Sequence, residues 1–96
     1  MAVKIFIKRT FSTDGLKDAS AMLIQARKNA MSNRGYISTE TLVSSEDPCE
    51  IVVVSMWQKQ EDWEAYAGSP ERQANEQKFA SILAAETEYQ VYNMGM

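Results

Sequence analysis

The chain has 96 residues, a formal net charge of −3, one cysteine and no histidine. Its length fits one domain, and its acidic balance (pI near 4.9) argues against nucleic acid and anionic membranes as partners. Without histidine, a Ser-His-Asp or Cys-His nucleophile system is excluded, and the ligand set for zinc is poor. The single Cys49 cannot form an internal disulfide, so we expect a reducing compartment, the cytoplasm, and interpret Cys49 as structural or incidental.

Residues 3–11 alternate between apolar and polar side chains, which predicts a strand with one apolar face rather than a signal peptide. A helical pattern follows from about Asp14 to Ser32, and Gly35 is expected to take a left-handed conformation after its end. Arg27 lies beside the apolar stripe of this helix. We interpret it as a snorkelling side chain that covers the core edge, with a role in pairing a ligand as the alternative. The stripe itself consists of Leu16, Ala19, Leu23, Ala26 and Ala30.

Two further strands are predicted over residues 36–44 and 50–57. The first alternates with mixed faces, whereas the second is almost continuously apolar and is therefore expected to be covered on both faces. It ends at Trp57, and Trp63, the only other tryptophan, follows on a short helix that reaches about Ala67.

Ser69 and Pro70 indicate the start of another helix, which we expect to reach about Ala85. Residues 87–93 form a last predicted strand. The residues of this helix that we expect to be buried are Ala74, Phe79, Ile82 and Leu83.

The predicted order is β-α-β-β-α-β, an α+β ferredoxin-like split βαβ arrangement with a four-stranded antiparallel sheet and helices on one face. Apolar side chains are expected on both faces of this sheet, among them Phe6, Val53 or Val54, and the tyrosines of the last strand. A second copy of the chain that packs sheet against sheet would cover the open face, so we expect a homodimer.

The segment from Arg34 to Arg72 carries the motifs RGYISTETL, DP, IVVVSMW, EDWEAY and SPER in succession. They resemble the antibiotic biosynthesis monooxygenase (ABM) domain family, and the resemblance extends over residues 1–96 as a single domain. It implies a dimeric α+β barrel. Relatives in the superfamily include cofactor-independent monooxygenases that oxidise polycyclic phenols, haem degraders, and proteins that isomerise or decarboxylate small molecules, so the fold does not decide the chemistry.

In the haem degraders of this superfamily, a Trp ends the third strand, an Asn lies in the first strand and a His lies on the last helix. Trp57 matches the first position, but Lys8 stands at the second and Asn75 or Glu76 at the third. Haem binding or degradation is therefore disfavoured. The phenol-oxidising relatives place a Trp, an Asn and an Arg around the substrate, which implies catalytic roles for Trp57 and Arg72 and leaves the Asn unassigned.

We expect the pocket between the sheet and the helices, where Trp57 either contacts a ligand through its indole N–H or fills the core. Trp63 is interpreted as core packing. Arg72 could hold a phenolate oxygen, or it could pair with Glu76 on the helix surface.

Tyr36, Glu40 and Glu76 are further candidates for substrate binding, next to Trp57. Tyr36, like Tyr89 and the other strand tyrosines, could donate a hydrogen bond to an aromatic ligand or pack at an interface. Glu40 is a candidate base or cross-strand partner because its neighbours on the strand are polar.

The function that this resemblance implies is a cofactor-independent monooxygenase for a phenolic or polycyclic aromatic molecule bound in an apolar cavity. Such a reaction relies on the substrate's own anion and on shielding from water, and it requires no metal and no cofactor. The alternative is a non-catalytic small-molecule-binding dimer of the same fold.

Overall fold

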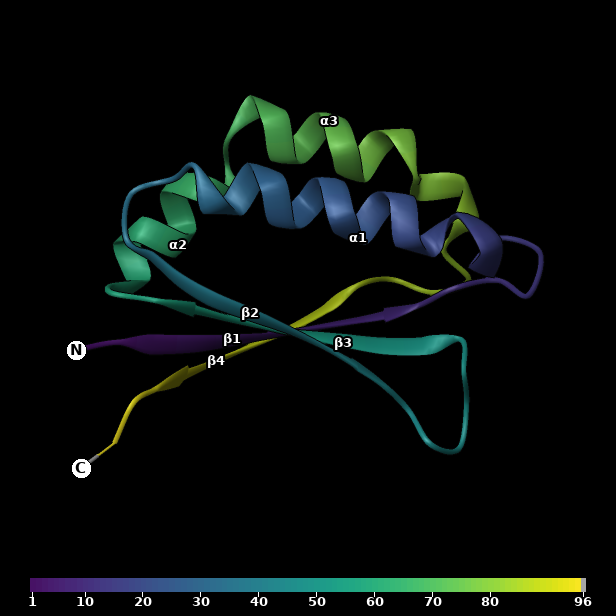
Figure 1. Cartoon of the computed structure of the whole chain (residues 1–96), viewed down its shortest axis with the longest axis horizontal. Helices are drawn as coiled ribbons and strands as arrows, with labels where there is room; N and C mark the ends of the chain where they lie inside the picture. The colour runs from purple at the N-terminus through teal and green to yellow at the C-terminus, as the bar shows by residue number, and fades with distance from the viewer. Residues whose placement is uncertain (96) are drawn as a thin grey trace.

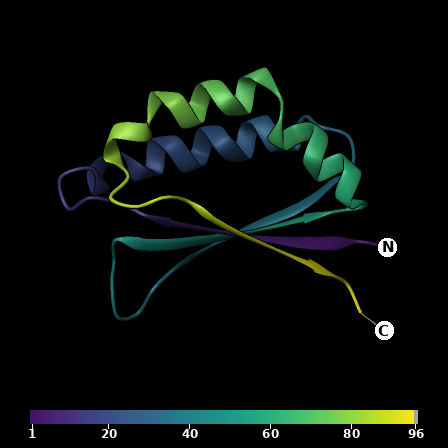
Figure 2. The same ribbon diagram turned by 180° about the vertical axis from the view of Figure 1, so that it is seen from behind.

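The structure, a computed structural model, describes residues 1–95. One antiparallel four-stranded sheet, in the order β2-β3-β1-β4, carries the helices on one face, and its other face is left uncovered (Figures 1 and 2). This confirms the predicted α+β ferredoxin-like arrangement. The elements are β1 (Val3–Thr10), α1 (Leu16–Met31), β2 (Tyr36–Val43), β3 (Glu50–Trp57), α2 (Gln60–Ala67), α3 (Pro70–Lys78), the 3₁₀ turn η1 (Ala80–Ile82) and β4 (Glu88–Asn93).

The odd-numbered residues of β1 face the helices, as the alternation of the sequence predicts. Val3, Ile5 and Ile7 are buried and lie opposite Trp57, Ser55 and Val53 of β3, respectively. β1 and β3 are the two central strands, so the core lies between them and the helices. The predicted stripe of α1 packs there, together with buried Met22.

The last predicted helix is shorter than expected. It ends at Lys78, and η1 follows before the chain leaves the helical layer. Its buried residues are Arg72 and Asn75, whereas Ala74 is exposed, so the prediction that Ala74 is buried was wrong. The helix buries these polar side chains because they have partners: Arg72 donates to the Tyr89 hydroxyl of β4, and Asn75 donates to the Met22 carbonyl of α1. In the described part of the chain, no helix has both the length and the apolar character needed to cross a membrane.

The turn between α1 and β2 depends on Gly35, which has a φ of 85°. This confirms the predicted left-handed position. A Cβ atom at this residue would also meet the side chain of Asp62 in α2, so a glycine is required for conformation and for space. The Gly35 carbonyl accepts a hydrogen bond from Gln58 N at 2.8 Å, which fixes the start of β2 beside the end of β3.

Candidate functional site

A cavity of about 30 Å³ lies between the sheet and the helices. Three of the four arginines of the chain line it, which contrasts with the acidic protein around it. The lining is therefore mixed, where the sequence predicted an apolar one. Its polar residues are Arg9, Arg27, Thr39, Thr41, Ser55, Tyr66 and Arg72, and its apolar residues are Ile7, Leu23, Ala26, Ala30 and Val53.

Arg9 is the most deeply buried of these arginines, with 2% of its surface exposed. It continues the inward-facing residues of β1. Its Nη2 donates a hydrogen bond to Oε2 of Glu76 at 3.0 Å, across 67 residues of sequence. Its Nε is buried and has no hydrogen-bond partner within the described residues. Because a buried donor without an acceptor costs about 1–3 kcal/mol, this atom calls for an explanation.

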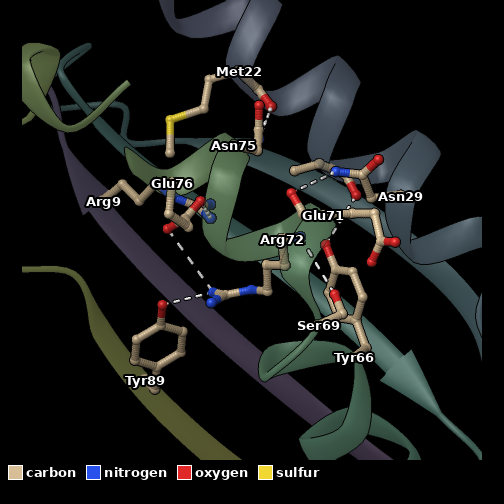
Figure 3. A network of polar contacts seen from close by, with 11 residues as sticks. Arg9, Met22, Asn29, Tyr66, Ser69, Glu71, Arg72, Asn75, Glu76 and Tyr89 are labelled. Carbon is tan, nitrogen blue, oxygen red and sulfur yellow. Dashed lines mark hydrogen bonds and ion pairs between the residues drawn. The ribbon is translucent and has the colours of Figure 1, made fainter. Parts of the chain in front are cut away.

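Arg72 enters the same region from the first turns of α3 and is 9% exposed (Figure 3). Its Nη2 donates to the Tyr89 hydroxyl at 2.6 Å and lies 3.9 Å from Oε1 of Glu76. Its guanidinium carbon lies 5.4 Å from the ring centroids of Trp63 and Tyr89, within the range of cation–π contacts. The interpretation of Arg72 as a surface arginine is therefore wrong.

The positive charge of the site exceeds its negative charge. Glu76 contacts both Arg9 and Arg72, and Arg27 adds a third cation at the exposed edge of the cavity. Arg27 on α1 and Thr41 on β2 are exposed, so the cavity reaches solvent between these two elements. Across residues 1–95, no three side chains among His, Cys, Asp and Glu gather as a metal site would require.

Tyr66 from α2 supplies a neutral hydroxyl at the cavity. It donates a hydrogen bond to the Ala26 carbonyl at 3.0 Å and thereby ties α2 to α1. Burial raises the pKa of Tyr66 above its usual value of 10.0, and the positive charges of Arg72 and Arg9 offset part of this effect. The phenol is therefore protonated and acts as a donor at neutral pH.

Trp57 lies behind the cavity wall rather than on it. It is fully buried, and its Nε1 donates to Oγ of Ser55 at 2.7 Å, while Ser55 itself lines the cavity. The indole stacks on Tyr66, with ring centroids 5.2 Å apart. Trp63 is buried in the same core cluster, which confirms its predicted packing role.

The other predicted site residues differ in their placement. The Tyr36 hydroxyl hydrogen-bonds with Oγ1 of Thr39 at 2.8 Å, so Tyr36, like Trp57, touches a lining residue. Glu40 lies on the opposite face of the sheet, because its neighbours Thr39 and Thr41 face the cavity. The structure thus brings Arg72 and Glu76 together and keeps Glu40 away from them.

Comparison with known families settles the place of this chain among proteins. The sequence model of the family described as antibiotic biosynthesis monooxygenase matches residues 13–87. The chain belongs to the ABM family. No functionally curated protein matches the sequence significantly.

Several solved structures share the fold of this ABM protein at low sequence identity. A conserved protein from Methanosarcina mazei Go1 superposes with a TM-score of 0.90 at 14% identity, covering 99% of this chain and 94% of its own. Rv0793 from Mycobacterium tuberculosis has a TM-score of 0.88 at 14% identity, covering 100% and 97%. SnoaB from Streptomyces nogalater, a cofactor-independent oxygenase, has a TM-score of 0.87 at 8% identity, covering 99% and 94%.

Sequence reasoning missed Arg9, Ser55 and Tyr66 as site residues of this ABM protein. A signal for Arg9 was present, since it stands in the same alternating phase as Val3 and Ile7 and thus on the apolar face of β1. A charged residue in that phase must have a partner or a ligand. Ser55 could have been found in the same way, because it alternates in phase with the buried residues Val53 and Trp57 of β3.

Proposed function

We propose that this protein is a cofactor-independent monooxygenase that acts on a small phenolic or polycyclic aromatic molecule. The observation that carries the proposal is the arginine-lined cavity between the sheet and the helices of an ABM protein. The likeness to SnoaB, a cofactor-independent oxygenase, supports the same reaction class. The cavity volume of about 30 Å³ suits an oxygen-bearing group of the substrate, and the rings would lie toward the opening between α1 and β2.

The chemistry that this geometry favours begins with the substrate's own anion. Guanidinium donors of Arg72 and Arg9 would stabilise a phenolate or enolate oxygen and so lower the pKa of the substrate's hydroxyl. Glu76, which contacts both arginines, is the carboxylate that we propose as the proton acceptor. The electron-rich ring carbon then reacts with dioxygen. For a ring CH₂ group, the products are C=O and one water, which balances atoms and electrons.

In this proposal Arg72 contacts the substrate, whereas Trp57 acts through Ser55. The indole N–H already has an acceptor in Ser55 Oγ, so Trp57 fixes the orientation of a hydroxyl on the cavity wall. Replacing Trp57 by Phe keeps an aromatic filler but removes the N–H. If the rate and the fold both survive this change, Trp57 is a filler only.

Oxygen uptake with a panel of anthrones, naphthols and quinols tests the function. We expect turnover of at least one compound without added metal or organic cofactor. Arg72→Lys should lower kcat/KM about tenfold to hundredfold, because one charged donor to the developing anion is lost. Arg34→Lys is the matched control, since Arg34 is exposed near the end of α1 and should leave the rate unchanged. Tight binding without any oxygen uptake would favour the alternative, a non-catalytic binding protein.

We also propose that the chain forms a homodimer through the uncovered face of the sheet. Phe6 packs edge-on against Tyr92 there, and Leu42 and Tyr92 are 49% and 53% exposed. An apolar surface of this kind on a sheet commonly marks an interface. Phe6→Glu should produce a monomer in sedimentation experiments. Ile24→Glu, on the exposed side of α1, is the control that should leave the mass unchanged, and a wild-type monomer would refute the dimer.

A further inference from the structure

The arginine cavity carries more positive charge than the described residues of the protein neutralise. Arg9 and Arg72 share one carboxylate, that of Glu76, and Arg72 lies 3.9 Å from it, beyond hydrogen-bond distance. Arg27 lines the same cavity from its exposed edge. Buried cations that lack an equal number of anions are destabilising, so an anionic ligand group would be favoured here.

Arg9 supplies a second and independent observation. Its guanidinium is almost fully buried, and its Nε has no acceptor in the described chain although the residue lines the cavity. Its Nη2 is already engaged with Glu76. A water molecule could satisfy the Nε–H, but it would leave the excess charge in place. An anionic oxygen would satisfy both.

The size of the cavity restricts the anion. A cavity volume of about 10–15 Å³ holds one water-sized group, so this cavity of about 30 Å³ holds about two such groups. This corresponds to the two oxygens of a carboxylate. A planar carboxylate also matches the flat fork of an arginine, whereas phosphate brings four oxygens and chloride only one acceptor atom.

We propose that this cavity receives a carboxylate group of the ligand, with Arg9 and Arg72 on its inner side and Arg27 at its opening. The inference rests on the proposed function in that it narrows the substrate to an aromatic hydroxy compound that also carries a carboxylate. The rings then lie toward Thr41 and Arg27, where the cavity reaches solvent, and a hydroxyl on the ring carbon beside the carboxylate stays next to the guanidinium of Arg72. The carboxylate selects the ligand and orients it.

The first experiment uses the wild-type protein and two probes of the same shape. Salicylate carries a carboxylate beside a phenol, and salicylamide replaces that carboxylate by a neutral amide. We expect calorimetric titration at fixed ionic strength to give at least about tenfold tighter binding of salicylate, as the loss of a charge-assisted hydrogen bond implies. Equal affinity, or no binding of salicylate, overturns the proposal.

Competition with inorganic anions tests the restriction to carboxylates. Acetate should compete with salicylate, while phosphate and chloride at the same ionic strength should compete more weakly. If phosphate or chloride competes as well as acetate, the cavity is a general anion site and the proposal is wrong.

The second experiment uses Arg9→Lys, which keeps the charge but removes the Nε donor. We expect salicylate affinity to fall by about tenfold and salicylamide affinity to remain unchanged. Arg34→Lys is the matched control and should bind both probes as the wild type does. Unchanged salicylate affinity in a folded Arg9→Lys variant overturns the proposal. If that variant does not fold, the comparison of salicylate with salicylamide on the wild-type protein decides whether the proposal stands.

These results are separable from the test of the proposed function. Selective binding of salicylate without oxygen uptake by any panel compound would leave the carboxylate site standing and remove the monooxygenase. Oxygen uptake at equal rates with carboxylated and carboxyl-free compounds, together with equal binding of the two probes, would support the monooxygenase and reject the carboxylate site.

Discussion

The layer between the sheet and the helices has two halves of opposite character. In the aromatic half, Trp57, Trp63 and Tyr66 pack on one another, and the polar atoms of Trp57 and Tyr66 have partners. In the arginine half, Arg9 has a buried donor that finds no partner among residues 1–95, and one carboxylate serves two cations. A half whose fully buried polar atoms have partners favours stability, whereas a half with a buried unpaired donor is suited to a ligand.

Arg72 joins the two halves. Its guanidinium lies near the rings of Trp63 and Tyr89 and also within 3.9 Å of Glu76. Changes in the aromatic half should therefore act mainly on the free energy of unfolding, and changes in the arginine half mainly on binding.

The largest effect on stability is expected at Trp57. Trp57→Ala removes a fully buried side chain that contacts Tyr36, Trp63 and Tyr66, so the free energy of unfolding should fall by about 3–5 kcal/mol. Urea unfolding followed by circular dichroism measures it. Trp57→Phe, which leaves a smaller cavity, is the graded control and should lose less. A Trp57→Ala variant as stable as the wild type would show that the aromatic half does not hold the fold together.

Glu76→Gln should have the next largest effect. The change removes the carboxylate that Arg9 contacts at 3.0 Å and leaves a cation buried beside a neutral amide. Because Glu76 is partly exposed, we expect a loss of about 2–3 kcal/mol, below the range for fully buried pairs. Glu88→Gln is the control. It removes an exposed carboxylate 3.9 Å from Lys8, so its effect should stay within about 0.5 kcal/mol.

Salicylate binding by Glu76→Gln tests whether the arginine half is the part that receives a ligand. If the cavity accepts carboxylates, salicylate should stabilise Glu76→Gln more than it stabilises the wild type, because the ligand then replaces the missing charge. Measuring the melting temperature with and without salicylate checks this. Equal shifts in both proteins would mean that Arg9 and the ligand do not meet.

The sequence predicts the burial of a residue well where the burial depends on its neighbours along the chain, and poorly where it depends on a side-chain partner from a distant segment. Periodicity was sufficient for β1, whose alternating side chains are alternately buried, and the predicted ranges of β2, β3 and β4 also match the observed strands. It failed on α3, where an apolar count favoured Ala74 but the buried face carries Arg72 and Asn75. Those polar residues are buried because distant groups satisfy them: Asn75 Nδ2, for example, donates to the Met22 carbonyl at 3.1 Å.

The candidate site was predictable only where the family motifs supplied it. Arg72 and Glu76 came from the resemblance and from their spacing of four residues, and the structure brings them together. The alternation of β1 placed Arg9 on the buried face, but no local pattern could identify its partner, because Glu76 lies 67 residues away. Glu40 was chosen for its polar neighbours, yet those threonines face the cavity and turn Glu40 to the other side of the sheet.

The smallest effect is expected at Tyr66, which borders both halves. Tyr66→Phe removes the hydrogen bond to the Ala26 carbonyl and should lower the free energy of unfolding by about 1 kcal/mol at neutral pH. Burial raises the pKa of Tyr66, so the folded state holds this proton more tightly than the unfolded state. Its contribution is therefore fully present below the unfolded pKa of 10.0 and is lost as pH rises through the folded pKa.

Urea unfolding at a series of pH values from about 8 to 11 measures this contribution. The stability of the wild type should fall above pH 10 more steeply than that of Tyr66→Phe, which has no proton to lose at this position. Ile24→Val, on the exposed side of α1, should keep the wild-type slope. If Tyr66→Phe keeps that slope as well, the Tyr66 hydroxyl is accessible to water in the folded protein. The boundary between the aromatic half and the arginine cavity then lies further into the core than Tyr66.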